Sequence, residues 1–181
     1  MYWVKDENID GFRCDVAGNV PTDFWQKTIP ELRKEKNIFM LAEAWEPELL
    51  KENLFDMCYN WDGHHTMNDI AQGKKNVSDW DKLMEAVSKK YEANDILMNF
   101  VDNHDENSWN GTMKSRLGNA EEAMTALSYL APGMPLVYSG DEYGLNHSLK
   151  FFEKDSSPKT KGKQWDWRAK LGKLKNENSA L

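Results

Sequence analysis

The chain has 181 residues, of which 40% are hydrophobic and 29% are charged, and its formal net charge is −7. This composition is typical of about one globular domain and excludes a disordered chain. The net negative charge argues against a nucleic-acid partner, because such proteins gather positive charge on one face. No apolar run is long enough for a membrane span and no signal peptide is visible, so the sequence leaves the localisation unknown.

Apolar runs of strand length alternate with stretches of helical periodicity along the chain. The expected strands are residues 9–16, 38–42, 54–59, 96–101 and 135–138. The expected helices are residues 22–36, a helix that starts at Ser78 with the stripe Trp80, Leu83, Met84 and Val87, and a helix from 119 to about Gly133. Strands separated by such helices predict βαβ units and an α/β fold with one parallel sheet.

Three local patterns complete this outline. We expect helix caps at or near Thr22, at Ser78 with Asp81 as a capping box, and at residues 119–122. Residues 155–164 are rich in turn formers and lysine, which predicts a basic loop before a last helix. Cys14 and Cys58 form no disulfide or CxxC framework, and both are expected to be buried thiols.

Polar residues stand where several of these strands end, which is where active sites lie in parallel α/β sheets. Arg13 and Asp15 are two residues apart, so on a strand they would share one face, and the arginine would keep the carboxylate ionised and oriented. A purely structural ion pair is the alternative interpretation. Glu43 ends the second strand between two alanines, where partial desolvation would favour a general acid, although a surface residue that begins a loop fits equally.

The third polar group follows the strand at 96–101 and consists of Asn103, His104 and Asp105. By itself this group fits a metal ligand set, a capping pair or a substrate clamp. Asp15, Glu43 and Asp105 would share one pocket mouth if the strands curve into a barrel wall. Glycoside cleavage requires such a set, because one carboxylate attacks or stabilises the sugar centre while another protonates the leaving oxygen.

These residues resemble the alpha-amylase family of glycoside hydrolases, family thirteen. The segment 11–20 fits the family block G-F-R-x-D-x-x-x-x-V, Glu43 stands in its strand-five glutamate block, and residues 103–105 fit its N-H-D block. Residues 135–142 resemble its strand-eight segment, with Asp141 where glutamine is more usual, and residues 171–178 resemble the last barrel helix. The resemblance implies strands four to eight of a TIM (β/α)8 barrel over residues 1–181, with no separate second domain. A complete barrel needs about 250 residues.

The resemblance also implies roles for single residues. Asp15 would be the nucleophile, Glu43 the general acid and then base, and Asp105 the transition-state stabiliser. Arg13 would orient Asp15, and His104 and Asn103 would belong to the same sugar subsite. Trp45, Trp61, Trp109 and Tyr143 are candidates for stacking on sugar rings, with ordinary packing as the alternative for each. His64 and His65 invite a metal interpretation, but no further ligand pattern supports one.

The expected function is that of a retaining alpha-glycoside hydrolase acting on alpha-glucans such as starch and maltooligosaccharides, without a cofactor in this chain. The family block near strand three, which helps to form a structural calcium site, has no counterpart here and is expected before Met1. We therefore expect a fragment with little activity alone, whose exposed sheet edges favour self-association. The alternative is a noncatalytic amylase-like module that binds sugar or serves in assembly.

Overall fold

The computed structural model describes residues 1–181 and divides into two compact units. Unit 1 consists of Met1–Asn60 and Ala86–Met98, and unit 2 consists of Trp61–Glu85 and Asn99–Leu181. The chain crosses from one unit to the other three times, after Asn60, after Glu85 and after Met98. The two units are described separately below.

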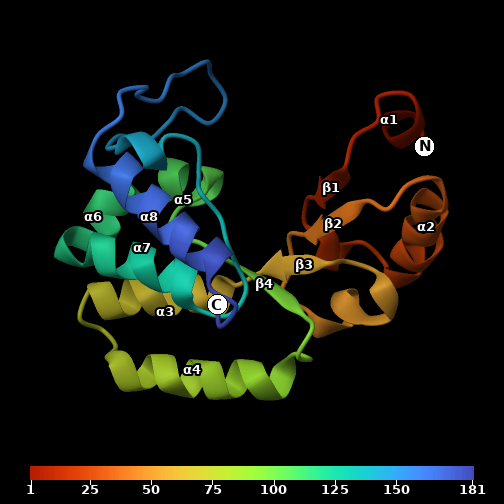
Figure 1. The fold of residues 1–181 in the computed structure, drawn as a ribbon, viewed down its shortest axis with the longest axis horizontal. Helices are drawn as coiled ribbons and strands as arrows, with labels where there is room; N and C mark the ends of the chain where they lie inside the picture. Colours follow the sequence, from red (N-terminus) through yellow and green to blue (C-terminus); the bar gives the residue numbers. More distant parts are fainter. The chain divides into compact units, whose positions relative to one another are not determined.

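Five short strands form the sheet, and four of them lie in unit 1 apart from the final residue of the fourth (Figure 1). They are β1 (Gly11–Cys14), β2 (Phe39–Ala42), β3 (Met57–Tyr59), β4 (Ile96–Asn99) and β5 (Met134–Pro135), in that order across the sheet. The pairs β1–β2, β2–β3 and β3–β4 are parallel. This confirms the predicted α/β class with a parallel sheet.

The strands are shorter than the apolar runs that predicted them. Strand β1 ends at Cys14, where its pairing with Ala42 of β2 ends. The prediction that Asp15 lies on this strand is therefore wrong, because Asp15 stands in the turn that follows. Strands β3 and β4 likewise cover only 57–59 and 96–99 of the apolar runs at 54–59 and 96–101.

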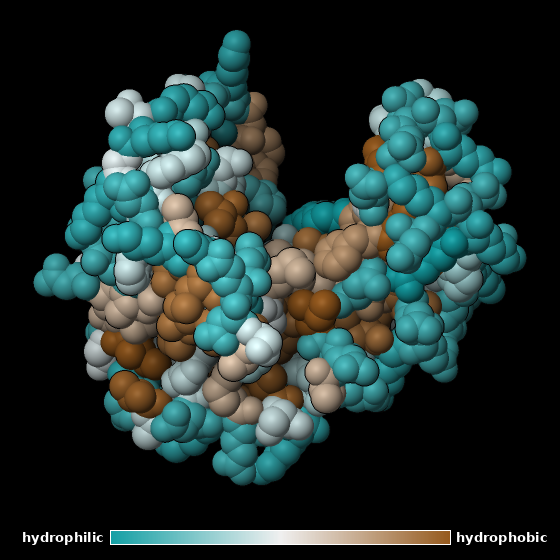
Figure 2. Space-filling view, in the orientation of Figure 1, coloured by the Kyte–Doolittle hydropathy of each residue, from teal (hydrophilic) through white to brown (hydrophobic).

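The helical elements of unit 1 surround a single apolar core. They are α1 (Tyr2–Lys5), η1 (Ala17–Asn19), α2 (Thr22–Glu35) and η2 (Pro47–Asn53). Helix α2 buries one stripe, formed by Trp25, Ile29 and Leu32, as expected from i, i+4, i+7 spacing. The surface over α2 is mainly hydrophilic in Figure 2, because its polar residues face solvent. The predicted cap at Thr22 is wrong: Pro21 is the N-cap residue, and no side chain caps the helix.

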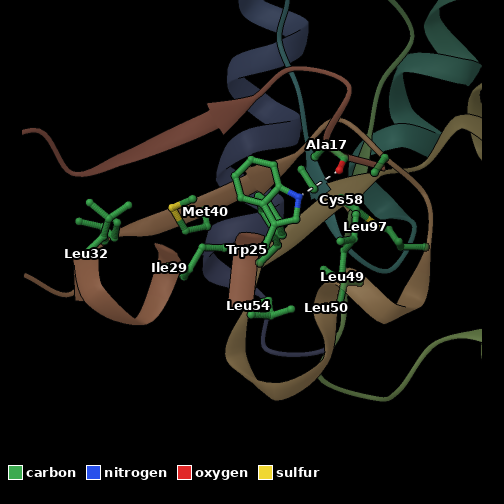
Figure 3. Close-up of a cluster of buried hydrophobic side chains, with 14 of the residues drawn as sticks. Ala17, Trp25, Ile29, Leu32, Met40, Leu49, Leu50, Leu54, Cys58 and Leu97 are labelled. Carbon is green, nitrogen blue, oxygen red and sulfur yellow. Dashed lines mark hydrogen bonds between the residues drawn. The ribbon is translucent and has the colours of Figure 1, made fainter. Parts of the chain in front are cut away.

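The core of unit 1 lies between α2 and the sheet, as Figure 3 shows. Trp25 packs edge-on against Phe55, with ring centroids 5.0 Å apart, and its indole Nε1 donates to the carbonyl oxygen of Ala17 at 3.1 Å. Cys58 is fully buried in this core, which raises its thiol pKa to about 12. Cys14 is only half-buried, which corrects the expectation of two buried thiols, and both cysteines are free.

Unit 2 is mainly helical. Its helices are α3 (Trp61–Ala71), α5 (His104–Trp109), α6 (Met113–Leu117), η3 (Gly118–Ala120), α7 (Glu121–Leu130), η4 (Asp141–Tyr143) and α8 (Lys163–Glu177), and α4 (Val77–Lys90) begins here and ends in unit 1. A small apolar cluster of Met67, Val101, Met113 and Leu117 forms part of its core. No helix of the structure has both the length and the apolar character that crossing a membrane requires.

Three predicted helix starts in unit 2 need correction. In α4 the cap lies two residues earlier than expected, because Asn76 accepts from Ser78 N–H at 2.9 Å and Asp79 accepts from Asn76 N–H at 3.0 Å. Helix α7 begins at Glu121 without a side-chain cap and ends at Leu130, before Gly133. Residues 155–162 have no regular secondary structure, as predicted, but α8 starts at Lys163, eight residues before the expected last helix.

Candidate active site

Arg13 brings two of the predicted carboxylates together in unit 1. It extends from β1, and its Nη1 lies 2.5 Å from Oδ1 of Asp15, so the predicted contact is present although Asp15 is in the turn. Its Nη2 lies 2.8 Å from Oε1 of Glu43, which follows β2. One guanidinium therefore bridges the carboxylates of the residues that directly follow two neighbouring strands.

The groups around Arg13 keep its guanidinium protonated. Burial alone would lower the pKa of this guanidinium, but hydrogen bonds to Tyr59 and Asp15 and the charge of Glu43 raise it above its ordinary value. Nε donates to Tyr59 Oη at 3.3 Å, and the guanidinium lies over the Tyr59 ring at 5.7 Å. Arg13 is therefore a permanent cation between Asp15 and Glu43.

The two bridged carboxylates differ in exposure. The side chain of Asp15 is 77% exposed, whereas that of Glu43 is 14% exposed. The backbone N–H of Val16 donates to Oε2 of Glu43 at 2.7 Å, so both carboxylate oxygens of Glu43 accept hydrogen bonds. Asp15 is thus accessible from solvent, while Glu43 is fixed in a mostly buried position.

Trp45 follows Glu43 and presents an exposed ring, since half of the residue's surface is accessible. Its backbone N–H donates to Glu46 Oε2 at 3.0 Å, and its carbonyl oxygen accepts from Tyr91 Oη at 2.6 Å. An aromatic ring held by its backbone and open to solvent is suited to stacking on a sugar face. Its assignment to a substrate site remains a prediction.

The Asn103-His104-Asp105 segment begins helix α5 in unit 2. Asn103 is the N-cap residue, and its Oδ1 accepts from the N–H of Glu106 at 2.7 Å. Asn103 is buried, so the structure gives this predicted substrate ligand a capping contact. The other two side chains are accessible: His104 is 44% exposed and Asp105 is 36% exposed, with 3.6 Å between His104 Nε2 and Asp105 Oδ2.

A buried charge network supports the backbone on either side of this segment. Arg116 of α6 donates through Nη2 to Asp102 Oδ1 at 2.8 Å and to the carbonyl oxygen of Val101 at 2.9 Å. Its Nη1 donates to Asn68 Oδ1 at 3.0 Å, and its Nε donates to the carbonyl oxygen of Gly111 at 3.1 Å. Burial raises the pKa of Asp102 to about 6, and the Arg116 charge offsets only part of that effect.

His64 joins the same network from α3. Its Nε2 lies 3.1 Å from Glu106 Oε2, its Nδ1 lies 3.1 Å from the carbonyl oxygen of Phe100, and its ring stacks on Phe100 at 4.5 Å. Burial alone would raise the pKa of Glu106, but the hydrogen bonds from His64 and Asn110 and the charge of Arg116 lower it. His64 therefore has protein partners on both ring nitrogens.

The residues of this chain do not fit a metal centre. No group of three or more His, Cys, Asp or Glu side chains is placed so that it could hold a metal ion. The calcium site that the family resemblance implies for a longer protein is therefore assigned no ligand here.

Asp141, the departure from the usual family pattern, is buried in unit 2 beside Arg168 of α8. Asp141 Oδ2 lies 3.4 Å from Arg168 Nη2, and the two side chains are 1% and 4% exposed. Burial raises the pKa of Asp141 from 3.8 to about 7, Arg168 opposes this shift, and the neighbouring Asp102 adds to it. The pair ties η4 to α8.

This raised pKa predicts a pH dependence of stability. Because folded Asp141 retains a proton that the unfolded chain releases, its contribution is full below pH 4 and is lost as pH rises through 7. The free energy of unfolding should fall between pH 5 and 8 by an amount on the order of a few kcal/mol. Urea midpoints measured at pH 5, 6, 7 and 8 should show this fall in wild type and a flatter profile in Asp141→Asn. If the urea midpoints of wild type and Asp141→Asn change with pH in the same way, Asp141 is not the source of the pH dependence.

The remaining aromatic candidates lie in unit 2 and differ in exposure. Trp109 is 60% exposed and packs beside Phe151 at 5.1 Å. Trp61 is half-buried against Phe100 at 4.9 Å, and Tyr143 is half-buried beside Trp165 at 5.4 Å. Trp109 therefore has the free ring surface that stacking requires, whereas packing accounts for the positions of Trp61 and Tyr143.

Two contributors to the candidate site were missed by sequence reasoning. Tyr59 ends β3 and holds Arg13, and the rule that polar residues at strand ends form the site could have found it. The backbone N–H of Val16 donates to the carboxylate of Glu43. A backbone donor of this kind leaves no signal in the pattern of side chains, so the sequence could not predict it.

The structure thus combines a parallel sheet in an α/β fold with an arginine that bridges the carboxylates following β1 and β2. The family model described as the alpha-amylase catalytic domain matches residues 1–170, so the chain belongs to the alpha-amylase family.

Several known proteins are similar to this chain. The intracellular maltogenic amylase of Bacillus subtilis (strain 168) is 29% identical over 156 residues, which cover 81% of this chain and 26% of that protein. The 4-alpha-glucanotransferase of Thermotoga maritima is 30% identical over 158 residues, covering 77% of this chain and 32% of that protein. The crystal structure of a noncanonic maltogenic alpha-amylase, AmyB, from Thermotoga neapolitana aligns with a TM-score of 0.85 at 28% identity, covering 98% of this chain and 41% of that one.

These coverages mean that the chain spans about a quarter to a third of the two curated relatives. The activity of a whole protein therefore does not transfer from them to this chain directly.

Proposed function

We propose that the chain supplies part of the catalytic barrel of a retaining alpha-glycoside hydrolase that acts on alpha-glucans such as starch and maltooligosaccharides. The observation that carries this proposal is the bridge from Arg13 to both Asp15 and Glu43. It is supported by membership of the alpha-amylase family and by relatives named as maltogenic amylases and cyclomaltodextrinases. In this proposal β1 to β5 correspond to strands four to eight of the barrel.

Asp15 and Glu43 divide the chemistry according to their exposure. Asp15 is exposed and paired with Arg13, so in this proposal it attacks the anomeric carbon and forms the glycosyl–enzyme bond. Glu43 protonates the departing glycosidic oxygen and then takes a proton from the water that hydrolyses the intermediate. Because each step inverts the anomeric carbon, two steps give net retention.

In the same proposal Asp105 and His104 of unit 2 are ligands of sugar hydroxyl groups, the role that the family resemblance implies for them. Both side chains are accessible, and α5, which begins with them, is anchored by Asn103 and by the Arg116 network. Trp45 would offer the stacking surface for a neighbouring sugar ring.

The proposal is tested with the longest open reading frame that encodes this chain. Maltoheptaose should be cleaved, and ¹H NMR in the first minutes should show the alpha anomer of the new reducing end before mutarotation. First appearance of the beta anomer, or no cleavage of maltoheptaose or starch, would overturn it.

The alternative is a noncatalytic module that binds sugar or serves in assembly. It is favoured by the small part of each relative that the chain spans. The purified 181-residue chain should release little reducing sugar, because catalysis depends on positioning to fractions of an ångström. Binding of maltoheptaose by the full reading frame without any cleavage would favour this alternative.

A further inference from the structure

Val16, next to the proposed nucleophile, has a backbone conformation that valine rarely adopts. Its φ is 42° and its ψ is 45°, in the left-handed region. A β-branched residue there is a conformational outlier, because its Cβ crowds the following backbone. Val16 is 46% exposed, so burial of its side chain in the core does not explain the conformation.

The left-handed turn directs two successive backbone N–H groups toward one residue, Glu43. Val16 N–H donates to the Glu43 carboxylate oxygen Oε2 at 2.7 Å, and Ala17 N–H donates to the Glu43 carbonyl oxygen at 3.1 Å. The N–H of Glu43 donates in return to the carbonyl oxygen of Cys14 at 3.0 Å. Of these groups, only the Val16 N–H contacts the carboxylate, and the other two bonds join the backbones of the two segments.

Ala17, the residue after Val16, anchors the turn in the apolar core of unit 1. Ala17 is fully buried, and its carbonyl oxygen accepts from the indole of Trp25 at 3.1 Å. The conformation of Val16 is therefore fixed by its neighbours, as backbone strain at a functional position requires.

We propose that Val16 is a positioning residue: its left-handed backbone aims its N–H at Oε2 of Glu43 and fixes the orientation of that carboxyl group. Arg13 holds the other oxygen, Oε1, at 2.8 Å. The two donors that fix Glu43 thus come from residues 13 and 16, on either side of Asp15. The turn that presents the proposed nucleophile also orients the proposed acid, and this inference rests on the proposed roles of Asp15 and Glu43.

The direct test removes only the N–H. In the full reading frame, residue 16 is replaced by the α-hydroxy acid analogue of valine, which changes the amide to an ester. Losing one hydrogen bond to a charged group should lower kcat on maltoheptaose about 10- to 100-fold. KM should change little, and the pH profile of kcat should shift.

Two comparisons separate hydrogen-bond donation from general damage to the protein. The same ester at Val77, an exposed valine at the start of α4, should keep the wild-type rate. Val16→Gly keeps the N–H and removes the Cβ, so its kcat should lie closer to wild type than that of the ester at residue 16. A Val16 ester with the kcat and pH profile of wild type would overturn the proposal.

A second measurement does not depend on activity. With ¹⁵N-valine labelling of the same protein, the Val16 amide proton should titrate with the same midpoint as the carboxyl carbon of Glu43, and its titration should disappear in Glu43→Gln. An amide signal that ignores the Glu43 titration would overturn the positioning role even if the protein is active. If the Val16 amide proton and Glu43 titrate together but the protein hydrolyses no substrate, the proposed function is wrong and the hydrogen bond is established.

Discussion

Replacing Glu43 with glutamine is expected to lower kcat on maltoheptaose by about 10²- to 10⁴-fold, the usual contribution of a general acid–base group. Glutamine keeps the size of the side chain and can still accept from Arg13, but it carries no transferable proton. The rate is measured in the full reading frame by release of reducing sugar. Glu48→Gln, an exposed change at the start of η2, is the matched control and should keep the wild-type rate.

Substrates with different leaving groups test whether Glu43→Gln has lost the ability to donate a proton. An aryl alpha-maltoside with a good leaving group needs little protonation, so formation of the glycosyl–enzyme should be much less impaired in Glu43→Gln. Asp15→Asn should instead abolish cleavage of both substrates, because no leaving group replaces a nucleophile. Equal losses on both substrates in Glu43→Gln would count against its role as the acid.

Replacing Arg116 with methionine is expected to destabilise the fold by about 3–5 kcal/mol, the usual cost of breaking a buried ion pair from one side. The change leaves Asp102 and Glu106 buried without their cation and leaves the carbonyl oxygens of Val101 and Gly111 without a donor. Urea unfolding followed by circular dichroism measures the loss. Lys114→Met on the same helix is the control, since that side chain is 57% exposed and should contribute little.

The loss of stability in Arg116→Met should depend on pH. Because the pKa of Asp102 is already raised to about 6, removal of Arg116 drives this carboxyl toward its neutral form. The protonated acid is less costly to bury, so Arg116→Met should lose less stability at pH 5 than at pH 8. An equal loss at both values would show that lost packing, and not an uncompensated charge, is the cause.

The strands and the larger amphipathic helices could be predicted because apolar periodicity reports burial directly. Helix α3 was missed because several of its buried positions are polar: Gly63, His64 and Thr66 face inward. Their burial depends on partners distant in sequence, such as Glu106 for His64, which periodicity does not reveal. Helix α5 has only six residues, too few for apolar periodicity to indicate a helix, and its start is marked only by the cap from Asn103 to Glu106.

Part of the candidate site could also be predicted. The two-residue spacing of Arg13 and Asp15 was enough to expect their contact, even though the strand ends before Asp15. The contact of Arg13 with Glu43 could not be predicted, because it depends on how β1 and β2 are aligned. The left-handed conformation of Val16 could not be predicted either, because sequence preferences argue against it.

The alignment of β1 with β2 constrains how the gene that encodes this chain can change length. Cys14 pairs with Ala42, so the residues that follow both strands emerge at the same level. A deletion of one codon just before Phe39 would preserve every letter of the recognisable blocks. It would also turn alternate side chains of β2 to the opposite face and carry Glu43 away from Arg13. The bridge from Arg13 to Glu43 therefore depends on the number of residues between the two strands as well as on the residues themselves.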